Sequence, residues 1–236
     1  MFVGHYGVAF AVKSERNQIP LWVLFVAVQL LDFLWAPFVL LGIEKVRMVP
    51  GITATNSLDL YYMPYTHSLV GTLIWSGAAF LIYKLVRGAK TSNTAALIVA
   101  FAVFSHWILD LIVHRPDLAI YDNVLKVGFG LWNHRYLEFA LEIAILVGGI
   151  LIYLKRNSSV ARKAGIATFG VVLILIQVWN TLCRPAAYFG SNIRNNGSNL
   201  LYAFCRYCIF AREAVQARHW RRSSDWRTGL TLRSIR

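Results

Sequence analysis

The sequence predicts an all-α fold: a polytopic integral membrane bundle of about five transmembrane helices, preceded by a short N-terminal re-entrant segment. Two observations predict it. First, 57% of the 236 residues are hydrophobic. Second, these residues form long runs, each close to the ~20 residues that a helix needs to cross a bilayer. There are five such runs, at 20–41, 68–87, 94–113, 137–154 and 164–182. A soluble domain of this length needs no such runs.

The first twelve residues, MFVGHYGVAFAV, are apolar but too short to span the bilayer as a helix. They have no basic leading region and no clear small-residue cleavage site, so we do not interpret them as a cleaved signal peptide. We expect a re-entrant or interfacial segment in which Gly4 and Gly7 allow close approach to another helix.

The net charge of +13 is concentrated near the C-terminus, where residues 184–236 hold ten basic and two acidic residues. We therefore expect no nucleic-acid partner, and divide the chain into a membrane-embedded helical domain with a metal site (1–183) and an Arg-rich tail (184–236). Three interpretations of the tail stay open: a disordered extension, a basic arm on anionic lipid headgroups, or a reading-frame change near residue 183. Its single C-x-x-C, at Cys205 and Cys208, lacks the second pair that a zinc ribbon needs.

Basic residues of the first domain favour the loops on the N-terminal side of the membrane, which hold nine of them against five on the opposite side. The positive-inside rule then places the N-terminus in the cytoplasm. Loops 42–66 and 114–136 are expected to face outward.

Ionisable side chains within the apolar runs fall in one half of the predicted bundle, although each costs about 2.5–3.5 kcal/mol to insert. Asp32 lies nine residues before the end of its run, and His106 lies eight before His114. At 1.5 Å per residue, both are about 12–14 Å below the same surface. We expect one cluster opening outward, which His5 reaches from the other side. Its other members are Asp32, His67, His106, Asp110, His114, His134 and Glu138.

The spacing of these residues indicates metal binding. His106, Asp110 and His114 are four residues apart and share one face of a helix, and His134 and Glu138 have the same spacing. Imidazole nitrogen and carboxylate oxygen are ligands of zinc and related divalent ions, and a cation offsets the cost of burying carboxylates. A single intramembrane histidine can instead serve as an interhelical hydrogen-bond donor.

Three further acidic residues are interpreted differently. Glu142, one turn after Glu138, is expected to be a helix–helix contact or to support a ligand rather than to bind the ion. Asp117 and Asp122 are expected to be solvated loop residues.

The motifs GHYGVAF, LLDFLWAP, PYTHSLVG and SHWILDLIVH resemble those of the membrane-bound metal-dependent hydrolases of the YdjM-like group. The order of ligand-type residues is also similar to that of zinc-dependent phospholipase C, an all-helical fold with a three-metal site. The resemblance covers residues 1 to about 155. It matches, in chain order, His5, Asp32, His67, His106 with Asp110, His114, and His134 with Glu138. The chain departs from the YdjM-like group in having Asp32 alone where that group has a doubled acidic motif.

The resemblance implies a hydrolase of the bacterial inner membrane that acts on a phosphoester of a lipid or lipid-linked substrate. It implies two or three divalent ions, zinc or alternatively manganese. Asp32 and Asp110 would be the catalytic carboxylates, with Asp110 bridging toward a second ion near His5. Two alternatives are a small permease that uses intramembrane Asp and His as an ion or proton path, and a scaffold with a structural metal. A closed structural site needs only four ligands, which favours catalysis.

Overall fold

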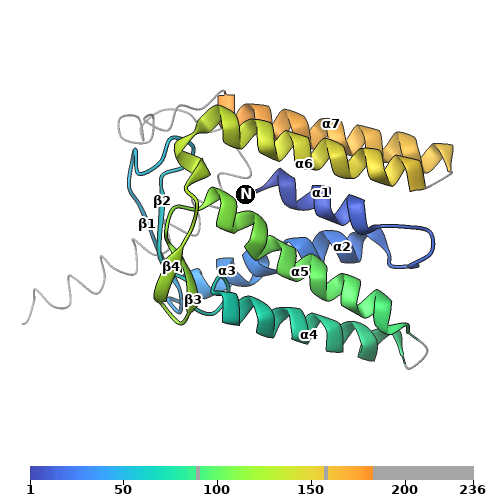
Figure 1. The fold of residues 1–236 in the computed structure, drawn as a ribbon, viewed down its shortest axis with the longest axis horizontal. Coiled ribbons are helices and arrows are strands. Elements are labelled where there is room, and N and C mark those ends of the chain that lie inside the picture. Colours follow the sequence, from blue (N-terminus) through green and yellow to red (C-terminus); the bar gives the residue numbers. More distant parts are fainter. Residues whose placement is uncertain (89–90, 157–158, 183–236) are drawn as a thin grey trace, which may run out of the picture.

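A computed structural model of the chain describes residues 1–88, 91–156 and 159–182. The fold is mostly helical, as the sequence predicts, and the described helices run roughly alongside one another (Figure 1). The Arg-rich tail, with its pair of cysteines, lies outside these residues.

Helices occupy all five predicted apolar runs and the N-terminal segment. Four of them are long and apolar enough to cross a membrane, and a bent pair, α2 and α3, forms a fifth candidate span. The helices are α1 (Val3–Val12), α2 (Leu21–Val28), α3 (Leu30–Leu40), α4 (Leu69–Arg87), α5 (Asn93–Val113), α6 (Arg135–Arg156) and α7 (Val160–Leu182).

The first apolar run is broken at Gln29, where α2 and α3 meet at an angle of 49°. Gln29 has φ −110° and ψ 6°, outside the helical region, so the hydrogen-bond ladder is interrupted there. The break leaves the carbonyl of Val28 free to accept a hydrogen bond from another helix. It also places Asp32 in the first turn of α3.

Two small antiparallel hairpins fill the loops that were expected to face outward. Strands β1 (Lys45–Met48) and β2 (Leu58–Tyr62) pair Met48 with Leu58. Strands β3 (Leu118–Tyr121) and β4 (Val124–Val127) pair Tyr121 with Val124. These strands were not expected from the sequence. They lie at one end of the bundle, together with the short 3₁₀-helix η1 (Leu131–Asn133) (Figure 1).

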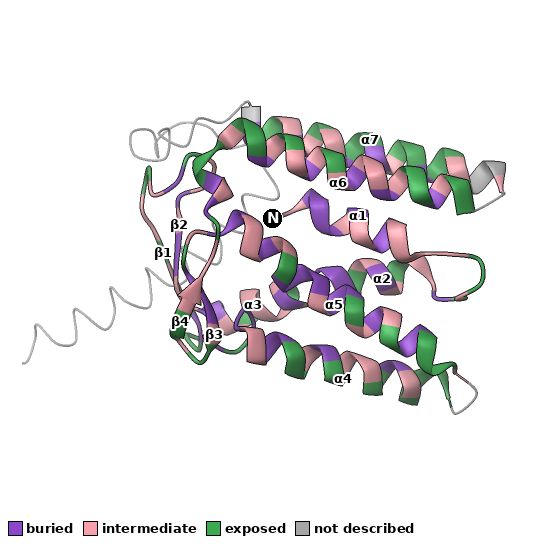
Figure 2. Cartoon of the chain, viewed as in Figure 1, coloured by how far each residue is buried: buried purple, intermediate pink, exposed green. Residues whose placement is uncertain are grey.

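The outward faces of α4, α6 and α7 are apolar and exposed (Figure 2). On α4 the exposed side chains include Leu73, Ile74, Leu81, Ile82, Leu85 and Val86. Soluble monomers rarely expose apolar patches this large. These faces are therefore suited to contact with lipid.

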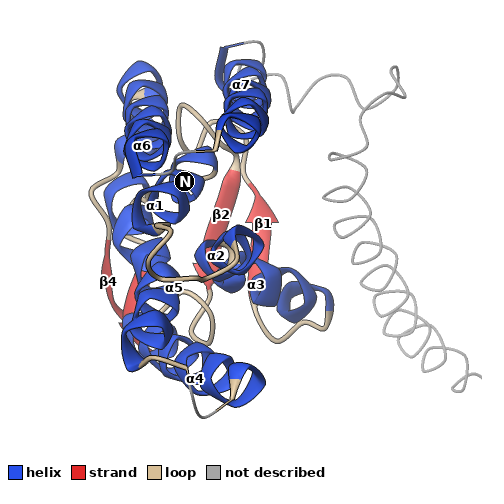
Figure 3. Cartoon of the chain, turned by 90° about the vertical axis from the view of Figure 1, so that its right-hand side faces the viewer, coloured by secondary structure: helices blue, strands red, loops and turns tan. Residues whose placement is uncertain are grey.

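Helices α1, α2 and α5 lie between the α6–α7 pair and α4 (Figure 3). Glycine allows the closest of these approaches: a Cβ at Gly149 of α6 would collide with the backbone of Gly7 in α1, and one at Gly7 would collide with the carbonyl of Ile145. The expected close approach at Gly7 is therefore confirmed. This crossing brings α1, and His5 with it, into the middle of the bundle.

Candidate metal centre

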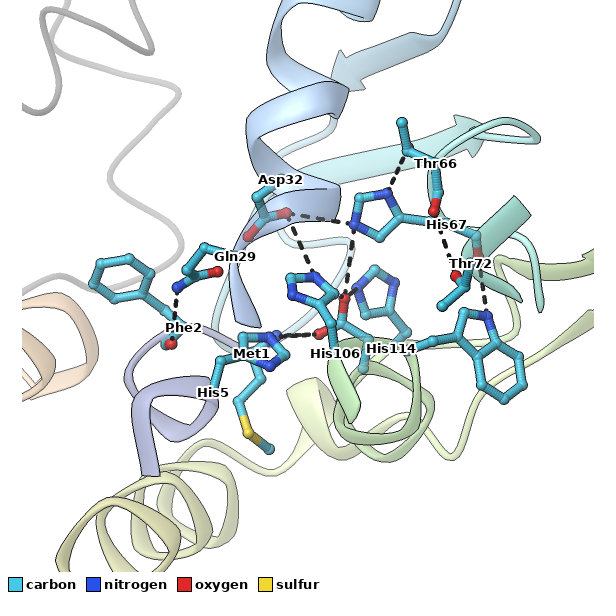
Figure 4. Close-up of polar contacts among 12 residues, drawn as sticks. Met1, Phe2, His5, Gln29, Asp32, Thr66, His67, Thr72, His106 and His114 are labelled. Carbon is cyan, nitrogen blue, oxygen red and sulfur yellow. Dashed lines mark hydrogen bonds and ion pairs between the residues drawn. The ribbon is translucent and has the colours of Figure 1, made fainter. Parts of the chain in front are cut away.

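Six side chains from separate segments converge beside the hairpin end of the bundle (Figure 4). His5 comes from α1, Asp32 from α3 and His67 from the loop before α4. His106 and Asp110 come from α5, and His114 is the residue that caps its C-terminal end. The four-residue spacing brings His106, Asp110 and His114 together as predicted.

Asp110 lies at the centre of this cluster and presents one carboxylate oxygen to each side. Its Oδ1 is 3.3 Å from His5 Nε2 and 2.7 Å from the Met1 nitrogen. Its Oδ2 faces three other histidines, with Nε2 distances of 3.2 Å to His106, 3.5 Å to His114 and 3.8 Å to His67. A carboxylate with this arrangement can bridge two ions.

Asp32 completes the side occupied by His67 and His106. Its Oδ1 is 3.4 Å from His67 Nε2 and 3.7 Å from His106 Nε2. Two groups therefore have the spacing of a metal site: His5, His106 and Asp110 form one, and Asp32, His67 and His106 form the other. His106 belongs to both.

The distances match what a metal ion requires of its ligands. Two ligands held ~2.05 Å from zinc at a tetrahedral angle lie about 3.3 Å from each other. The separations between Nε2 and carboxylate oxygen run from 3.2 to 3.8 Å. They exceed the mode of an N–H···O hydrogen bond, which is about 2.9–3.0 Å.

Hydrogen bonds fix which ring nitrogen of His106 can face the cluster. Its Nδ1 is 2.7 Å from the Val28 carbonyl exposed by the break between α2 and α3. A carbonyl only accepts, so Nδ1 carries the proton and donates it. A neutral His106 therefore turns the lone pair of Nε2 toward Asp110 and Asp32.

His67 and His114 are oriented in the same way. His67 Nδ1 lies 2.7 Å from Thr66 Oγ1, and that hydroxyl donates to Glu44 Oε2 at 2.6 Å. His114 Nδ1 donates to Asp117 Oδ1 at 2.8 Å. In metal proteins, the ring N–H of a ligand histidine that does not face the metal characteristically donates a hydrogen bond to a carboxylate or carbonyl.

In the neutral tautomers these directions place nitrogen lone pairs opposite carboxylate oxygens, an arrangement that repels unless a proton or a metal cation lies between them. The Nε2 atoms of His5 and His106 are buried and make no hydrogen bond within the described part of the chain. A divalent cation satisfies lone pairs and carboxylates together, so the donor set fits a metal ion. Burial lowers the pKa of His114, but the Asp110 and Asp117 carboxylates outweigh it and raise that pKa above its ordinary value.

The cluster is closed on one side and open on the other. The Asp110 side chain is 3% exposed and His106 is 0% exposed, whereas the Asp32 side chain is 41% exposed. A structural metal site is closed, while a catalytic one keeps a position for water or substrate. Asp32 marks the side from which a ligand can enter.

Two predicted ligands lie outside the cluster. His134 is exposed, directly after η1. Glu138 is buried at the start of α6, and its Oε2 has no hydrogen-bond partner among the described residues. Neither belongs to the two groups with metal-site spacing, and His114, although it faces Asp110, is also in neither group.

Glu142 anchors α1 to α6. Its carboxylate accepts hydrogen bonds from the Phe2 nitrogen at 3.0 and 3.1 Å and from the Gly4 nitrogen at 3.0 Å. The free N–H groups at the start of a helix favour a carboxylate at that position. Glu142 is thus the expected helix–helix contact, and it holds the turn that carries His5.

Sequence reasoning missed the residues that support the ligands. Asp117 was expected to be solvated; it is instead buried against His114 and Arg115, and Arg115 also pairs with Asp59 of β2. Glu44 is buried although it lies in a polar loop. The only signal for Asp117 was its position three residues after a candidate ligand. Nothing in the sequence around Glu44 indicated that it contacts Thr66.

Comparisons with known proteins add no relative. No family model matches the chain, and neither the curated proteins nor the solved structures contain a significant match.

Proposed function

We propose that this chain is a membrane-embedded, metal-dependent hydrolase that cleaves a phosphoester of a lipid or lipid-linked substrate. One observation carries the proposal: four histidines and two carboxylates converge, three of the imidazoles have Nε2 directed inward by hydrogen bonds at Nδ1, and one carboxylate is open to the surroundings. The resemblance to YdjM-like hydrolases and to zinc-dependent phospholipase C supports the same chemistry.

The membrane location is supported by the four long apolar helices and their exposed outer faces. The basic residues support an orientation. At the end of the bundle opposite the hairpins, the described chain carries Lys13, Arg16, Lys84, Arg87, Lys155, Arg156 and Lys163. By the positive-inside rule this end faces the cytoplasm, so the metal centre opens toward the other side.

The side chains have distinct roles in the proposed reaction. Asp110 bridges the two halves of the cluster, and His5, His67, His106 and His114 complete the ligand set. A divalent ion bound there supplies Lewis acidity, which polarises a phosphoryl group and makes water a better nucleophile. Asp32, the exposed carboxylate, lies where the phosphoryl group and the attacking water would meet the ligands.

An apolar cavity of about 510 Å³ favours a substrate with a hydrocarbon part. It lies between α3, the start of α4 and the turn of the β3–β4 hairpin, and its lining includes Phe38, Ile43, Tyr65, Ile74 and Trp75. Tyr65 is two residues before His67, so the same loop forms a wall of the cavity and carries a ligand. Ile74 also belongs to the exposed face of α4, which joins the cavity to the surface proposed to face lipid.

The proposal is tested by purifying the full chain in detergent and counting bound metals by mass spectrometry. We expect two or three zinc or manganese ions per chain, lost in both His106→Ala and Asp110→Asn. Glu15→Gln is the matched control, because Glu15 is an exposed carboxylate in the loop between α1 and α2, outside both the cluster and the cavity. Hydrolysis is then measured on phospholipids in mixed micelles, by the amount of water-soluble phosphate ester that is released.

Two results would contradict the proposal in different ways. A folded wild-type protein without stoichiometric metal would remove the metal centre. If metal is bound in the wild type and lost in the variants, but no phosphoester tested is hydrolysed, the hydrolase activity is ruled out. That result would favour an ion path through the same side chains.

A further inference from the structure

Glu44 is a fully buried carboxylate in the loop between α3 and β1. Its Oε1 accepts hydrogen bonds from the backbone nitrogens of Tyr65 and Thr66, both at 2.9 Å. Its Oε2 accepts from the Thr66 hydroxyl at 2.6 Å. Glu44 does not touch the cluster itself, yet it fixes the residue immediately before His67.

The direction of each hydrogen bond in this chain is determined. An ionised carboxylate only accepts, so the single hydroxyl proton of Thr66 points at Glu44. The Thr66 oxygen can then only accept from His67, whose Nδ1 lies 2.7 Å away. His67 therefore carries its proton on Nδ1 and leaves Nε2 unprotonated toward Asp32 and Asp110.

We propose that Glu44 and Thr66 are positioning residues that hold His67 in the tautomer able to bind a metal ion through Nε2. That this tautomer serves metal binding rests on the proposed metal centre, but the tautomer itself is a property of the protein alone. The backbone of His67 is fixed separately, since its carbonyl accepts from Trp107 Nε1 at 3.0 Å. Glu44 Oε1 helps to hold the loop before His67, whereas the Thr66 hydroxyl between Glu44 Oε2 and His67 Nδ1 controls which ring nitrogen carries the proton.

Glu44→Gln reverses this chain of hydrogen bonds without changing its shape. The amide oxygen must stay where Oε1 is, because two backbone N–H groups point at that position. The amide NH₂ then donates to the Thr66 oxygen, and the Thr66 proton turns toward His67 Nδ1. His67 is left with a proton on Nε2, which cannot bind a metal ion in that form.

Thr66 allows two variants of different severity, and Thr72 provides a matched control. Thr66→Val removes the hydroxyl at similar volume, and Thr66→Ser restores it. Thr72→Val is the control: Thr72 is equally buried and donates to the Thr66 carbonyl at 3.4 Å, whereas the partner of His67 Nδ1 is the Thr66 hydroxyl. The control therefore makes the same chemical change in the same region without breaking the connection to the ring.

Metal affinity is measured first, by competition with a chromogenic zinc chelator. Loss of a residue that supports a metal ligand typically costs 10–100-fold in affinity. We expect a loss of that size in Glu44→Gln and Thr66→Val, and affinity close to wild type in Thr66→Ser and Thr72→Val. Folded Glu44→Gln and Thr66→Val variants with wild-type affinity would overturn the inference.

The second measurement does not depend on metal. Ring nitrogen shifts of ¹⁵N-histidine-labelled, metal-free protein are recorded at mildly alkaline pH, with His67 assigned by comparison with His67→Gln. We expect a proton on Nδ1 alone in the wild type and on Nε2 alone in Glu44→Gln. Any other wild-type state, or the same state in both proteins, would overturn the inference. The expected tautomers in a protein that bound no metal would support the positioning role and count against the proposed metal centre.

Discussion

The imidazole rings of His5 and His106 lie stacked, with centroids 3.9 Å apart and planes 3° from parallel. The two residues come from α1 and α5, and neither side chain is exposed. Each ring directs Nε2 at a different oxygen of Asp110. The stack thus packs two helices together while presenting two ring nitrogens to one carboxylate, so packing and ligation can be separated by mutation.

His5→Phe keeps an aromatic ring on His106 but removes the nitrogen that faces Asp110. We expect the variant to remain folded and to bind one metal ion fewer per chain than the wild type. Mass spectrometry of the purified protein, beside a thermal unfolding curve, measures both properties. An unchanged metal count would show that His5 is a packing residue only.

Asp117→Asn tests the support of His114. The carboxylate accepts from His114 Nδ1 at 2.8 Å and from Arg115 Nε at 3.2 Å. An amide cannot accept equally at both positions, so His114 is held less firmly and is less basic. We expect metal affinity to fall by roughly tenfold, at the low end for residues that support metal ligands. The exposed Asp122→Asn should bind metal as the wild type does.

His134→Ala and His114→Ala distinguish the ligand set seen in the structure from the wider one expected from the sequence. His114 is buried with Nε2 3.5 Å from Asp110 Oδ2, although it belongs to neither metal-site group, whereas His134 is exposed and outside the cluster. We expect His114→Ala to lower the metal content and His134→Ala to leave it unchanged. An equal loss of bound metal in the two variants would show that His134 is also a metal ligand.

Gly149→Ala and Gly148→Ala form a matched pair on α6. A methyl group at Gly149 would collide with the backbone of Gly7, whereas one at Gly148 meets open space. We expect Gly149→Ala to lower the free energy of unfolding by about 1–3 kcal/mol through overpacking. Gly148→Ala should raise it by about 0.5–1 kcal/mol, because alanine is the better helix former. Denaturant titration in detergent compares the two; similar values would exclude a tight crossing of α1 and α6.

The helices and the core of the cluster could be predicted from periodic patterns in the sequence. The apolar runs gave the helices, and the spacing of His106, Asp110 and His114 gave the core of the cluster because residues four apart share a helix face. The rise of 1.5 Å per helical residue predicts that Asp32 lies level with His106. Their side chains do meet, with Asp32 Oδ1 3.7 Å from His106 Nε2.

The remaining features depend on contacts that leave no local pattern. Glu44 and Thr66 are 22 residues apart and separated by the β1–β2 hairpin, so no spacing rule relates them. His134 has the four-residue spacing to Glu138, but it is the residue before α6, with φ −122° and ψ 75°, and its side chain is exposed. The break at Gln29 was equally hidden, because α2 and α3 together read as one continuous apolar run.

The attachment of α1 to α6 also has a consequence for biogenesis. Glu142 holds the Phe2 nitrogen across 140 positions of sequence, and Gly149 packs on Gly7 at a similar separation. Segments carrying the other five cluster residues leave the ribosome before α6 does. Helix α1 therefore waits for its packing partner until α6 has been synthesised, and the cluster matures only after α6 has been inserted. Metal loading would then report completed assembly of the bundle.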